Sequence, residues 1–362
     1  MANRDKVEME DEIAAKVAEL GNTRIICRSG DPTDLYDLAL VSPQQARSII
    51  VLSPESDSAG ADQADSQVIK TILALVNDPR RRAAPYRIAA EIRDAKNAEV
   101  ARVVGGAEAQ LVLADDLIAR IVVHSSRQAG LSAVYSELLD FDGCEIYTLE
   151  QPGLTGNTFG DALMAYESST LIGLVTAEGQ VSLNPPMESI IGAGARAVLI
   201  AEDDAAIAIV TEGISVDAAA MRSARRQPPQ AERVLLLGWN RRAPIIAYEL
   251  SRFVAPGSLL TIAADTPDLD ETVAGLAIAS DNLAVEYGRI DTTSRSALEA
   301  LDIPAYDHVL VLGYSDILAP QPTDTSTLVT LLHLRKIADA AGIHINVVSE
   351  MVDVRNRELA EV

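Results

Sequence analysis

Residues 233–265 hold the side chains whose types and spacing are nearest to a ligand-binding fingerprint. Gly238 follows a run of apolar residues, and Asp265 ends the next such run. Asn240 and Ala243 stand where two further glycines would complete a G-x-G-x-x-G turn, in which the second glycine admits a pyrophosphate and the later acid holds a ribose hydroxyl. Because Asn240 obstructs that approach, the pattern predicts the fold more firmly than a nucleotide. The alternative is structural: Gly238 makes a tight turn and Asp265 is a solvated acid.

Further polar residues follow predicted strands in both halves of the chain. They are Gly30, Asp31, Ser53 and Glu91 in the first half and Gly313, Ser315 and Glu350 in the second. Ligands of open α/β sheets bind at the carboxyl ends of the strands, so these residues are candidates for a ligand site. Capping or turn formation is the structural alternative. Asn3 falls where the first half would place its ribose-binding acid.

Three consecutive carboxylates, Glu202, Asp203 and Asp204, follow another predicted strand and form a candidate calcium site, since calcium prefers several oxygen ligands. Without EF-hand spacing or an interleaved glycine, a solvated turn is the favoured explanation. The four histidines have no metal-ligand spacing, and Cys27 and Cys144 fit small core residues. We find no G-x-S-x-G elbow, Walker A loop or catalytic pairing, and we expect no enzyme.

The composition narrows the classes of partner. The 362-residue chain has a net charge of −23 and 48% hydrophobic residues. Such a charge argues against nucleic acid and against an anionic membrane surface, while the apolar content allows sizeable cores. No run reaches the length of a membrane span, the N-terminus is too polar for a signal peptide, and two distant cysteines suit a reducing compartment. We therefore expect a cytoplasmic protein.

The elements that must position these residues alternate along the chain. Strand-like runs at 24–28, 48–52 and 87–91 are separated by helical patterns at 34–40 and 64–76. Alternation of this kind predicts a parallel sheet covered by helices on both faces.

An internal repeat links the two halves. EIRDAKNAEVA at 91–101 matches EMVDVRNRELA at 350–360, an offset of 259 residues (350 − 91), and the same offset pairs Asp65 with Asp324 and Thr71 with Thr330. A single offset over a helix and a strand indicates tandem duplication. By this offset the first copy lacks its first strand and Gly turn.

These patterns predict an α/β fold with two Rossmann-like units and a small α+β lobe between them. The expected segments are a first lobe at 1–114, crossover helices at 115–143, a β-rich lobe at 144–217, a Pro-containing linker at 218–232 and a second lobe at 233–362, without a small lobe of its own. Within the crossover, 115–134 is so apolar that we expect it to contact a neighbouring subunit.

The sequence resembles the cytosolic region of the CASTOR/POLLUX family of ion channels, which carries tandem RCK (TrkA-N/TrkA-C-like) units. The resemblance rests on runs such as VGGAEAQLVLADDLIARI, RQAGLSAVYSELLDFDGCEIY, LLLGWNRRAPIIAYEL and FVAPGS, and it covers nearly the whole chain. It implies a homo-oligomeric ring at the cytosolic face of a membrane, beneath a cation-conducting pore domain. The pore helices are not in this chain, which therefore cannot itself conduct ions.

We therefore expect a gating-ring module that couples binding of a ligand, such as a nucleotide, calcium or potassium, to cation transport. No cofactor is required by the sequence. The alternatives are a soluble TrkA-like regulatory subunit of a potassium transport system and, less favoured, an NAD-dependent oxidoreductase, which would need an intact phosphate turn and a nearby catalytic group.

Overall fold

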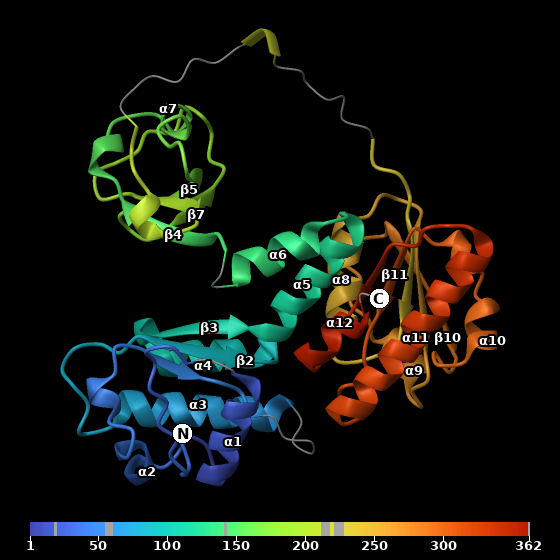
Figure 1. Ribbon diagram of the computed structural model, residues 1–362, viewed down its shortest axis with the longest axis horizontal. Coiled ribbons are helices and arrows are strands. Elements are labelled where there is room, and N and C mark those ends of the chain that lie inside the picture. Colours follow the sequence, from blue (N-terminus) through green and yellow to red (C-terminus); the bar gives the residue numbers. More distant parts are fainter. Residues whose placement is uncertain (18–19, 55–60, 141–142, 211–217, 221–227, 361–362) are drawn as a thin grey trace. The chain divides into compact units, whose positions relative to one another are not determined.

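The computed structural model describes residues 1–17, 20–54, 61–140, 143–210, 218–220 and 228–360. Contacts divide the chain into two compact units (Figure 1), one made of Met1–Ser126 with Gln230–Val362 and the other of Arg127–Pro229. Among the described residues, no helix combines the length and apolar character needed to cross a bilayer.

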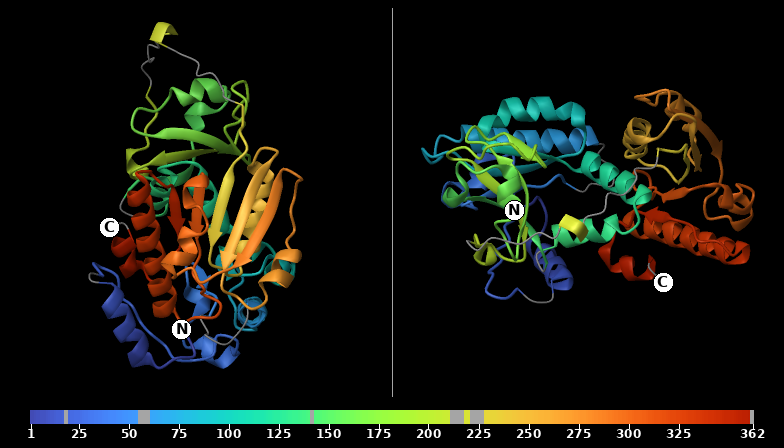
Figure 2. Two further views of the ribbon diagram at one scale, coloured as in Figure 1. Left: turned by 90° about the vertical axis from the view of Figure 1, so that its right-hand side faces the viewer. Right: turned by 90° about the horizontal axis from the view of Figure 1, so that it is seen from above.

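The second lobe contains a five-stranded parallel sheet with the order β10-β9-β8-β11-β12. The strands, side by side in the left view of Figure 2, are β8 Arg233–Leu237, β9 Ser258–Ala264, β10 Leu283–Arg289, β11 His308–Val311 and β12 Val347–Ser349. Counted along the chain, this order is 3-2-1-4-5, the order of a dinucleotide-fold sheet. The strand order therefore reverses between β8 and β11, where ligands of such sheets bind.

Both faces of this sheet are buried, as expected for parallel strands. Val234 and Leu236 of β8 pack in a core with α8 (Ala243–Phe253), while Leu235 and Leu237 pack in a core that includes residues of α11 (Pro320–Ala341). The alternating direction of strand side chains produces this division. The remaining helices of the lobe are α9 Leu269–Ala274, α10 Arg295–Glu299 and α12 Arg357–Ala360.

The first lobe contains a three-stranded parallel sheet with the order β1-β2-β3. Its strands are β1 Ile49–Val51, β2 Ile88–Ile92 and β3 Ala109–Leu113, and its helices are α1 Lys6–Lys16, α2 Leu35–Ala39, α3 Ala61–Asn77 and α4 Ala98–Gly105. A core joins this sheet to α2, α3 and α4.

The repeat is visible in the elements themselves. Helices α3 and α11 begin at residues 61 and 320, and short 3-10 turns occupy 95–97 and 354–356, so both pairs keep the offset of 259. Before α3 the offset is 260. Ile49 of β1 pairs with Ile88 and Val309 of β11 pairs with Val347, and the residues Ser42 and Asp302, which both have a left-handed backbone, correspond. One residue has therefore been gained or lost between β1 and α3.

Two expected elements differ in the structure. Residues 24–28 do not form a strand, and the neighbouring Ser29 makes a single parallel bridge with Ala2. The single helix expected at 115–134 is two helices, α5 (Ala114–Arg127) and α6 (Leu131–Leu139). Gly130 separates them with φ of 84°, a conformation that ends a helix at little cost only in glycine.

Helix α5 packs on the second lobe of its own chain. Its Ala119, Val122 and Val123 belong to the same core as Ile246 and Leu250 of α8. This apolar face of α5 is therefore used within the chain, and contact of the segment 115–134 with a neighbouring subunit stays a prediction.

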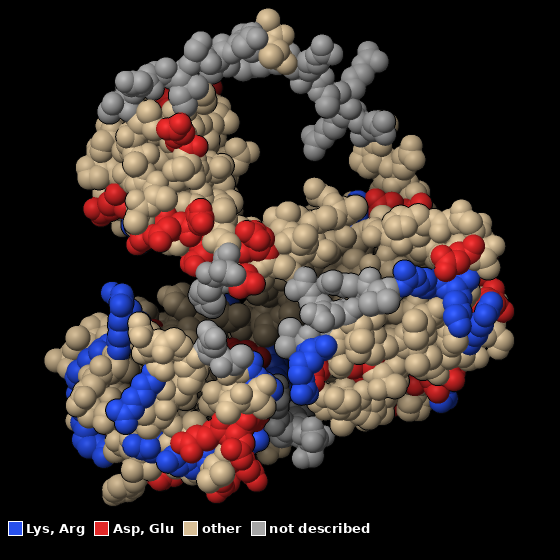
Figure 3. All heavy atoms as spheres, viewed as in Figure 1, with Lys and Arg blue, Asp and Glu red and all other residues tan. Residues whose placement is uncertain are grey.

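The unit Arg127–Pro229 is built on a four-stranded antiparallel sheet with the order β4-β7-β5-β6. Its elements besides α6 are β4 Glu145–Glu150, α7 Phe159–Leu163, β5 Thr170–Val175, β6 Val181–Leu183 and β7 Arg196–Ala201. Arg127 and Arg196 are the only basic residues between 127 and 210. Figure 3 accordingly shows acidic patches over this unit on the face in view. Within the linker expected at 218–232, residues 221–227 lie outside the described residues.

Candidate functional site

The site is centred on the turn between β8 and α8, where the strand order of the second sheet reverses. Gly238 has φ of 84°, and a Cβ atom at this position would lie 2.1 Å from the carbonyl oxygen of Leu312. Glycine is therefore required twice, by the left-handed backbone and by the close approach of the end of β11. The predicted tight turn is present.

Asn240 lies inside this turn with 1% of its surface exposed. Its Nδ2 donates to the Gly313 carbonyl at 2.9 Å and to Glu350 Oε2 at 2.8 Å, and its Oδ1 accepts from the Arg242 amide at 3.0 Å. The side chain thus ties β8 to the ends of β11 and β12. Its polar atoms are occupied by these contacts, at the position where a fingerprint glycine would leave room for a phosphate.

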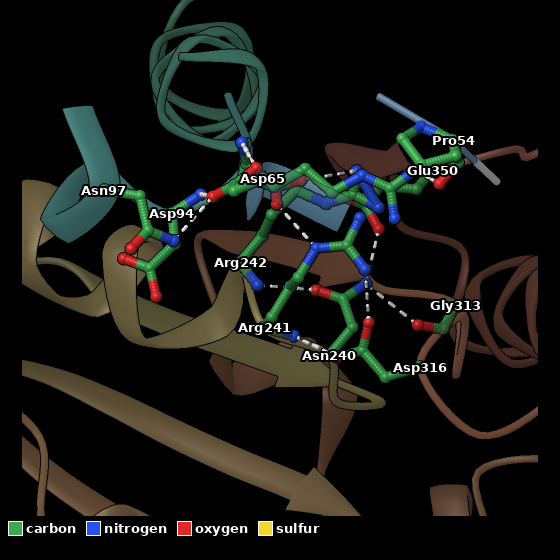
Figure 4. Close-up of polar contacts among 12 residues, drawn as sticks. Pro54, Asp65, Asp94, Asn97, Asn240, Arg241, Arg242, Gly313, Asp316 and Glu350 are labelled. Atoms are coloured by element: carbon green, nitrogen blue, oxygen red, sulfur yellow. Dashed lines mark hydrogen bonds and ion pairs between the residues drawn. The ribbon is translucent and has the colours of Figure 1, made fainter. Parts of the chain in front are cut away.

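Arg242 lies between two carboxylates, of which that of Glu350 is labelled in Figure 4. Its Nη1 is 3.7 Å from Asp115 Oδ1 and its Nε is 3.0 Å from Glu350 Oε1. The side chains of all three residues are nearly buried, being 12%, 4% and 10% exposed. The Nε and Oε1 atoms are close but not aligned for a hydrogen bond, so their contact is an electrostatic one.

Arg241 extends the network on the same turn. Its Nε donates to Asp115 Oδ2 at 2.5 Å and its Nη1 to Asp316 Oδ1 at 2.8 Å, while its amide donates to Asp316 Oδ2. Burial opposes the charged form of Arg241, but Asp115 and Asp316 outweigh it and raise its pKa. Asp115 therefore joins the first turn of α5 to two arginines at the start of α8.

Glu350 is the acid at the centre of the carboxyl edge. Burial raises its pKa above the usual value, and the nearby charge of Asp115 adds to this effect. The Arg242 guanidinium, the Asn240 amide and the Gly313 backbone amide oppose the rise without cancelling it. A carboxyl group in this setting serves as an acceptor that holds the turn together.

The first lobe repeats this use of a glutamate. Glu91 Oε2 accepts a hydrogen bond from the Ser53 amide at 3.0 Å, as Glu350 accepts one from the Gly313 amide. Ser53 therefore corresponds to Gly313. Ser315 lies further along the chain, and its buried hydroxyl has no hydrogen-bond partner among the described residues. In both copies the glutamate ties neighbouring strand ends, which supports the capping alternative for this pair.

A second repeated device involves a buried aspartate on the long helix of each lobe. Asp65 accepts from the Arg93 and Asp94 amides at 2.9 and 3.0 Å and from Asn97 Nδ2 at 2.8 Å. Asp324 accepts from the Val352 and Asp353 amides at 2.8 and 2.9 Å and from Asn356 Nδ2 at 2.7 Å. Each of these donors lies 259 positions after the corresponding donor to Asp65. These contacts hold the turn after β2 and after β12.

The other candidate residues lie outside this network. Asp265 is half exposed and pairs with Arg289 at 2.9 Å, while its amide donates to the Tyr314 hydroxyl. Asp31 accepts from the Thr33 amide and hydroxyl, both at 2.8 Å, in a local turn that lowers its pKa. The Gly30 amide donates to the Ala2 carbonyl.

The acidic run at 202–204 follows β7 in the β-rich unit. Asp203 Oδ1 accepts from the Ala205 amide at 2.8 Å, which caps a short 3-10 turn and lowers the pKa of Asp203. Within the part of the chain that is described, no group of three His, Cys, Asp or Glu side chains has the geometry to hold a metal ion. The calcium site stays a prediction from the sequence.

Sequence reasoning missed the charged residues that dominate the site. Asp115, Arg241, Arg242 and Asp316 come together from three segments, and the Asp115–Arg241 pair spans 126 positions. The adjacent arginines directly after the Gly turn were the only local signal.

Three comparisons place the chain among known proteins. Residues 115–217 match a family model described as "Castor and Pollux, part of voltage-gated ion channel". The chain is 32% identical to the rice (Oryza sativa subsp. japonica) "Probable ion channel CASTOR" over 93% of its own length and 38% of that protein. It is 31% identical to the Arabidopsis thaliana "Probable ion channel POLLUX" over 93% of its length and 41% of that protein.

A solved structure confirms the fold. The human SLO3 gating ring aligns with 84% of this chain and 62% of its own length, with a TM-score of 0.61 and 14% sequence identity. The tandem Rossmann-like RCK architecture expected from the sequence is therefore correct. The chain spans less than half the length of the curated relatives it matches. Over 93% of its own length, the chain is similar to the CASTOR and POLLUX ion channels.

Proposed function

We propose that this chain is a cytosolic regulatory module, of gating-ring type, for a cation channel related to CASTOR and POLLUX. The observation that carries the proposal is the pair of Rossmann-like lobes, joined in one compact unit, in a chain that aligns with the channels over 93% of its length. The segments at 1–114, 115–143, 144–217, 218–232 and 233–362 are the proposed domains.

The charged network supplies a physical basis for regulation. Asp115 at the start of α5 holds the two arginines at the start of α8, and Arg120 Nε lies 3.4 Å from the buried Glu249 of α8. At the other end of α5, the side-chain amide of Asn346 donates through Nδ2 to the Ser126 carbonyl. A ligand that binds one arrangement of α5 and α8 more tightly than another shifts the population by its difference in affinity. A difference of a few kcal/mol between the ligand's binding free energies for the two arrangements would be sufficient.

A dinucleotide does not fit the second lobe as it stands. Asn240 fills the phosphate side of the Gly238 turn, and the guanidinium groups of Arg241 and Arg242 are already neutralised by the chain's own carboxylates. We therefore derive no regulatory step through a nucleotide at this turn. A bound cation remains the other proposed ligand, with 202–204 as its candidate site.

The proposed assembly is a ring of identical subunits. Light scattering coupled to size-exclusion chromatography at several protein concentrations measures it directly. A mass above that of one chain, rising with concentration, supports the ring, whereas a strict monomer at all concentrations contradicts it.

Ligand titration separates the alternatives. Isothermal titration calorimetry with CaCl₂, KCl, ADP, ATP and NADH would identify a ligand, and hydrogen exchange of 114–127 with and without that ligand would report whether α5 moves. NADH turnover would favour an oxidoreductase. Binding of a potassium transporter without assembly of a channel would favour a soluble TrkA-like subunit.

A further inference from the structure

Arginines gather on the first lobe at the amino end of its sheet. Arg87 directly precedes β2 and Arg47 lies two residues before β1, while the loop between α3 and β2 adds Arg80, Arg81 and Arg82. Because β1 and β2 are parallel, these residues share one edge of the lobe, which we call the arginine edge. Figure 3 shows Lys and Arg side chains over the end of the first lobe at which β3 starts in Figure 1.

The chain neutralises only part of this positive charge. Asp78 pairs with Arg80 at 3.0 Å, and Glu108 pairs with Arg81 at 2.7 Å. The other three arginines have no carboxylate within ion-pair distance among the described residues. Five arginines against two carboxylates leave a local charge of +3 (5 − 2), in a chain whose net charge is −23.

Arg82 is held in place without being neutralised. Its Nε, Nη1 and Nη2 donate to the carbonyl oxygens of Ala84, Ala46 and Pro85 at 3.3, 2.7 and 3.0 Å. Its guanidinium also lies 4.9 Å from the centre of the Tyr86 ring. A guanidinium has five N–H groups, so two (5 − 3) remain for an anionic partner. Because the side chain is already ordered, binding such a partner loses little further rotamer entropy.

The second lobe shows that the fold does not require these arginines. At the offset of 260, Arg47 corresponds to Asp307. At the offset of 259, the other four arginines correspond to Asp339, Ala340, Ala341 and Asn346. The same five positions therefore carry a charge of +5 in one lobe and −2 in the other, although both lobes form a parallel sheet. In the second lobe 337–341 continue helix α11, whereas α3 ends at Asn77 and leaves the arginines in a loop.

A surface of opposite charge lies on the β-rich unit. Residues 143–210 include nine Asp and Glu residues and one basic residue, Arg196. Glu145 at the start of β4 lies opposite the end of β7, and the exposed run 202–204 follows directly after β7. Burial raises the pKa of Tyr147, and the charges of Glu145 and of two residues in this run add to the rise, so these carboxylates lie around one side chain. We call Glu145 and 202–204 the acidic corner.

We propose that the arginine edge of the first lobe binds the acidic corner of a second copy of this chain. Guanidinium groups pair with carboxylates through two parallel hydrogen bonds, and complementary charge fixes which surfaces meet. The contact joins two different surfaces, so each copy keeps one free surface of each kind, and a series of such contacts can close into a ring. The inference rests on the assembly of identical subunits in the proposed function and names the surfaces that make it.

Two charge-reversed variants test the contact by mixing. Arg47→Glu with Arg87→Glu reverses the arginine edge, and Glu202→Lys with Asp204→Lys reverses the acidic corner, in each case at exposed side chains. In sedimentation equilibrium at 0.1 M NaCl, each variant alone should self-associate at least about tenfold more weakly than the original chain, because like charges then meet. In an equimolar mixture the reversed surfaces complement each other, so association should return to within about threefold of the original.

The outcomes separate this contact from the assembly as a whole. Weaker association of each variant without recovery in the mixture overturns the proposal, since it means that the two surfaces do not meet between copies. Unchanged self-association of both variants also overturns it, and leaves the ring to other surfaces. A monomeric original chain at all concentrations contradicts the assembly itself. Binding of that monomer to phosphatidylserine vesicles through Arg47 and Arg87 would assign the arginine edge to a membrane instead.

A matched control and a salt series complete the test. Arg28→Glu with Lys70→Glu makes the same change of charge on the side of the first lobe where Lys70 acts on Asp31, and should leave self-association within about twofold of the original. Equal weakening in this control would mean that net charge alone governs association, against the proposal. Self-association of the original chain, which needs no variant to fold, should weaken by at least about tenfold between 0.05 and 0.5 M NaCl. Association that stays constant over this range contradicts a contact made of charged pairs.

Discussion

Substitution of Asp115 by alanine tests the network that joins α5 to the second lobe. Asp115 is nearly buried and contacts Arg241 at 2.5 Å and Arg242 at 3.7 Å. Removing one partner of a buried pair costs about 3–5 kcal/mol when the other is left alone. Here Arg241 keeps Asp316 and Arg242 keeps Glu350, so we expect a smaller loss of about 2 kcal/mol.

That loss should appear as easier opening of α5. Because about 1.4 kcal/mol corresponds to a factor of ten, amide exchange in α5 should accelerate by roughly 30-fold, measured by hydrogen-exchange mass spectrometry at 0.15 M salt. Amides of β4 to β7 in the other unit should not change.

Asp116 provides the matched control. It lies next to Asp115 in the first turn of α5 and pairs with Arg120 on the same helix at 2.9 Å, in a more exposed position. Asp116→Ala removes the same charge from the same helix end, so any effect on the helix dipole is shared. It should cost only about 0.5 kcal/mol. Equal acceleration of exchange in the two variants would refute the role assigned to Asp115.

Five further substitutions probe the glycine turns, the two buried aspartates and the buried Glu350. Gly238→Ala should lower the free energy of unfolding in urea by more than about 3 kcal/mol, because it adds a steric clash to left-handed backbone strain. Gly257 also has a left-handed φ of 87°, but a Cβ atom there would meet no atom nearer than 3.7 Å, so Gly257→Ala should cost only about 1 kcal/mol. Equal losses in the two variants would contradict the clash at Gly238. Asp324→Asn and Asp65→Asn should each destabilise their own lobe by about 1–3 kcal/mol, because an amide has one acceptor oxygen for two backbone donors. Hydrogen exchange would locate the loss of stability. No loss in either lobe would count against the role of these aspartates in holding the turns after β2 and β12. Because the pKa of Glu350 is raised in the folded state, the stability of the original chain should fall relative to that of Glu350→Gln as pH rises above 4.5. Urea unfolding of both proteins at pH 4 to 8 would measure the difference in stability. A difference that does not change with pH would contradict the raised pKa.

The sequence predicted the second lobe well because its signals are local. A buried run, a Gly turn and an apolar helix pattern placed α8 at 243–253, where it is observed. The repeat identified Glu91 and Glu350 as equivalent before any contact was known. The helix expected at 115–134 was wrong in extent, because one glycine, Gly130, interrupts a pattern that is otherwise continuous.

The site itself could not be predicted in the same way. Asn240 suggested only an obstructed phosphate turn, and its partners come from the ends of β11 and β12, 73 and 110 positions away. The pairing of Asp115 with Arg241 and Arg242 depends on how α5 packs against α8. Packing of that kind leaves no spacing or period in the sequence.

Recordings from a chimeric channel would show whether this chain regulates a channel. In the rice CASTOR channel, the 350 matched residues would be replaced by this chain and single-channel currents recorded. We predict an assembled channel whose open probability is shifted by Asp115→Ala and unchanged by Asp116→Ala. If the assembled chimera gates like the channel with the region deleted, whatever the residue at 115, this chain does not regulate gating.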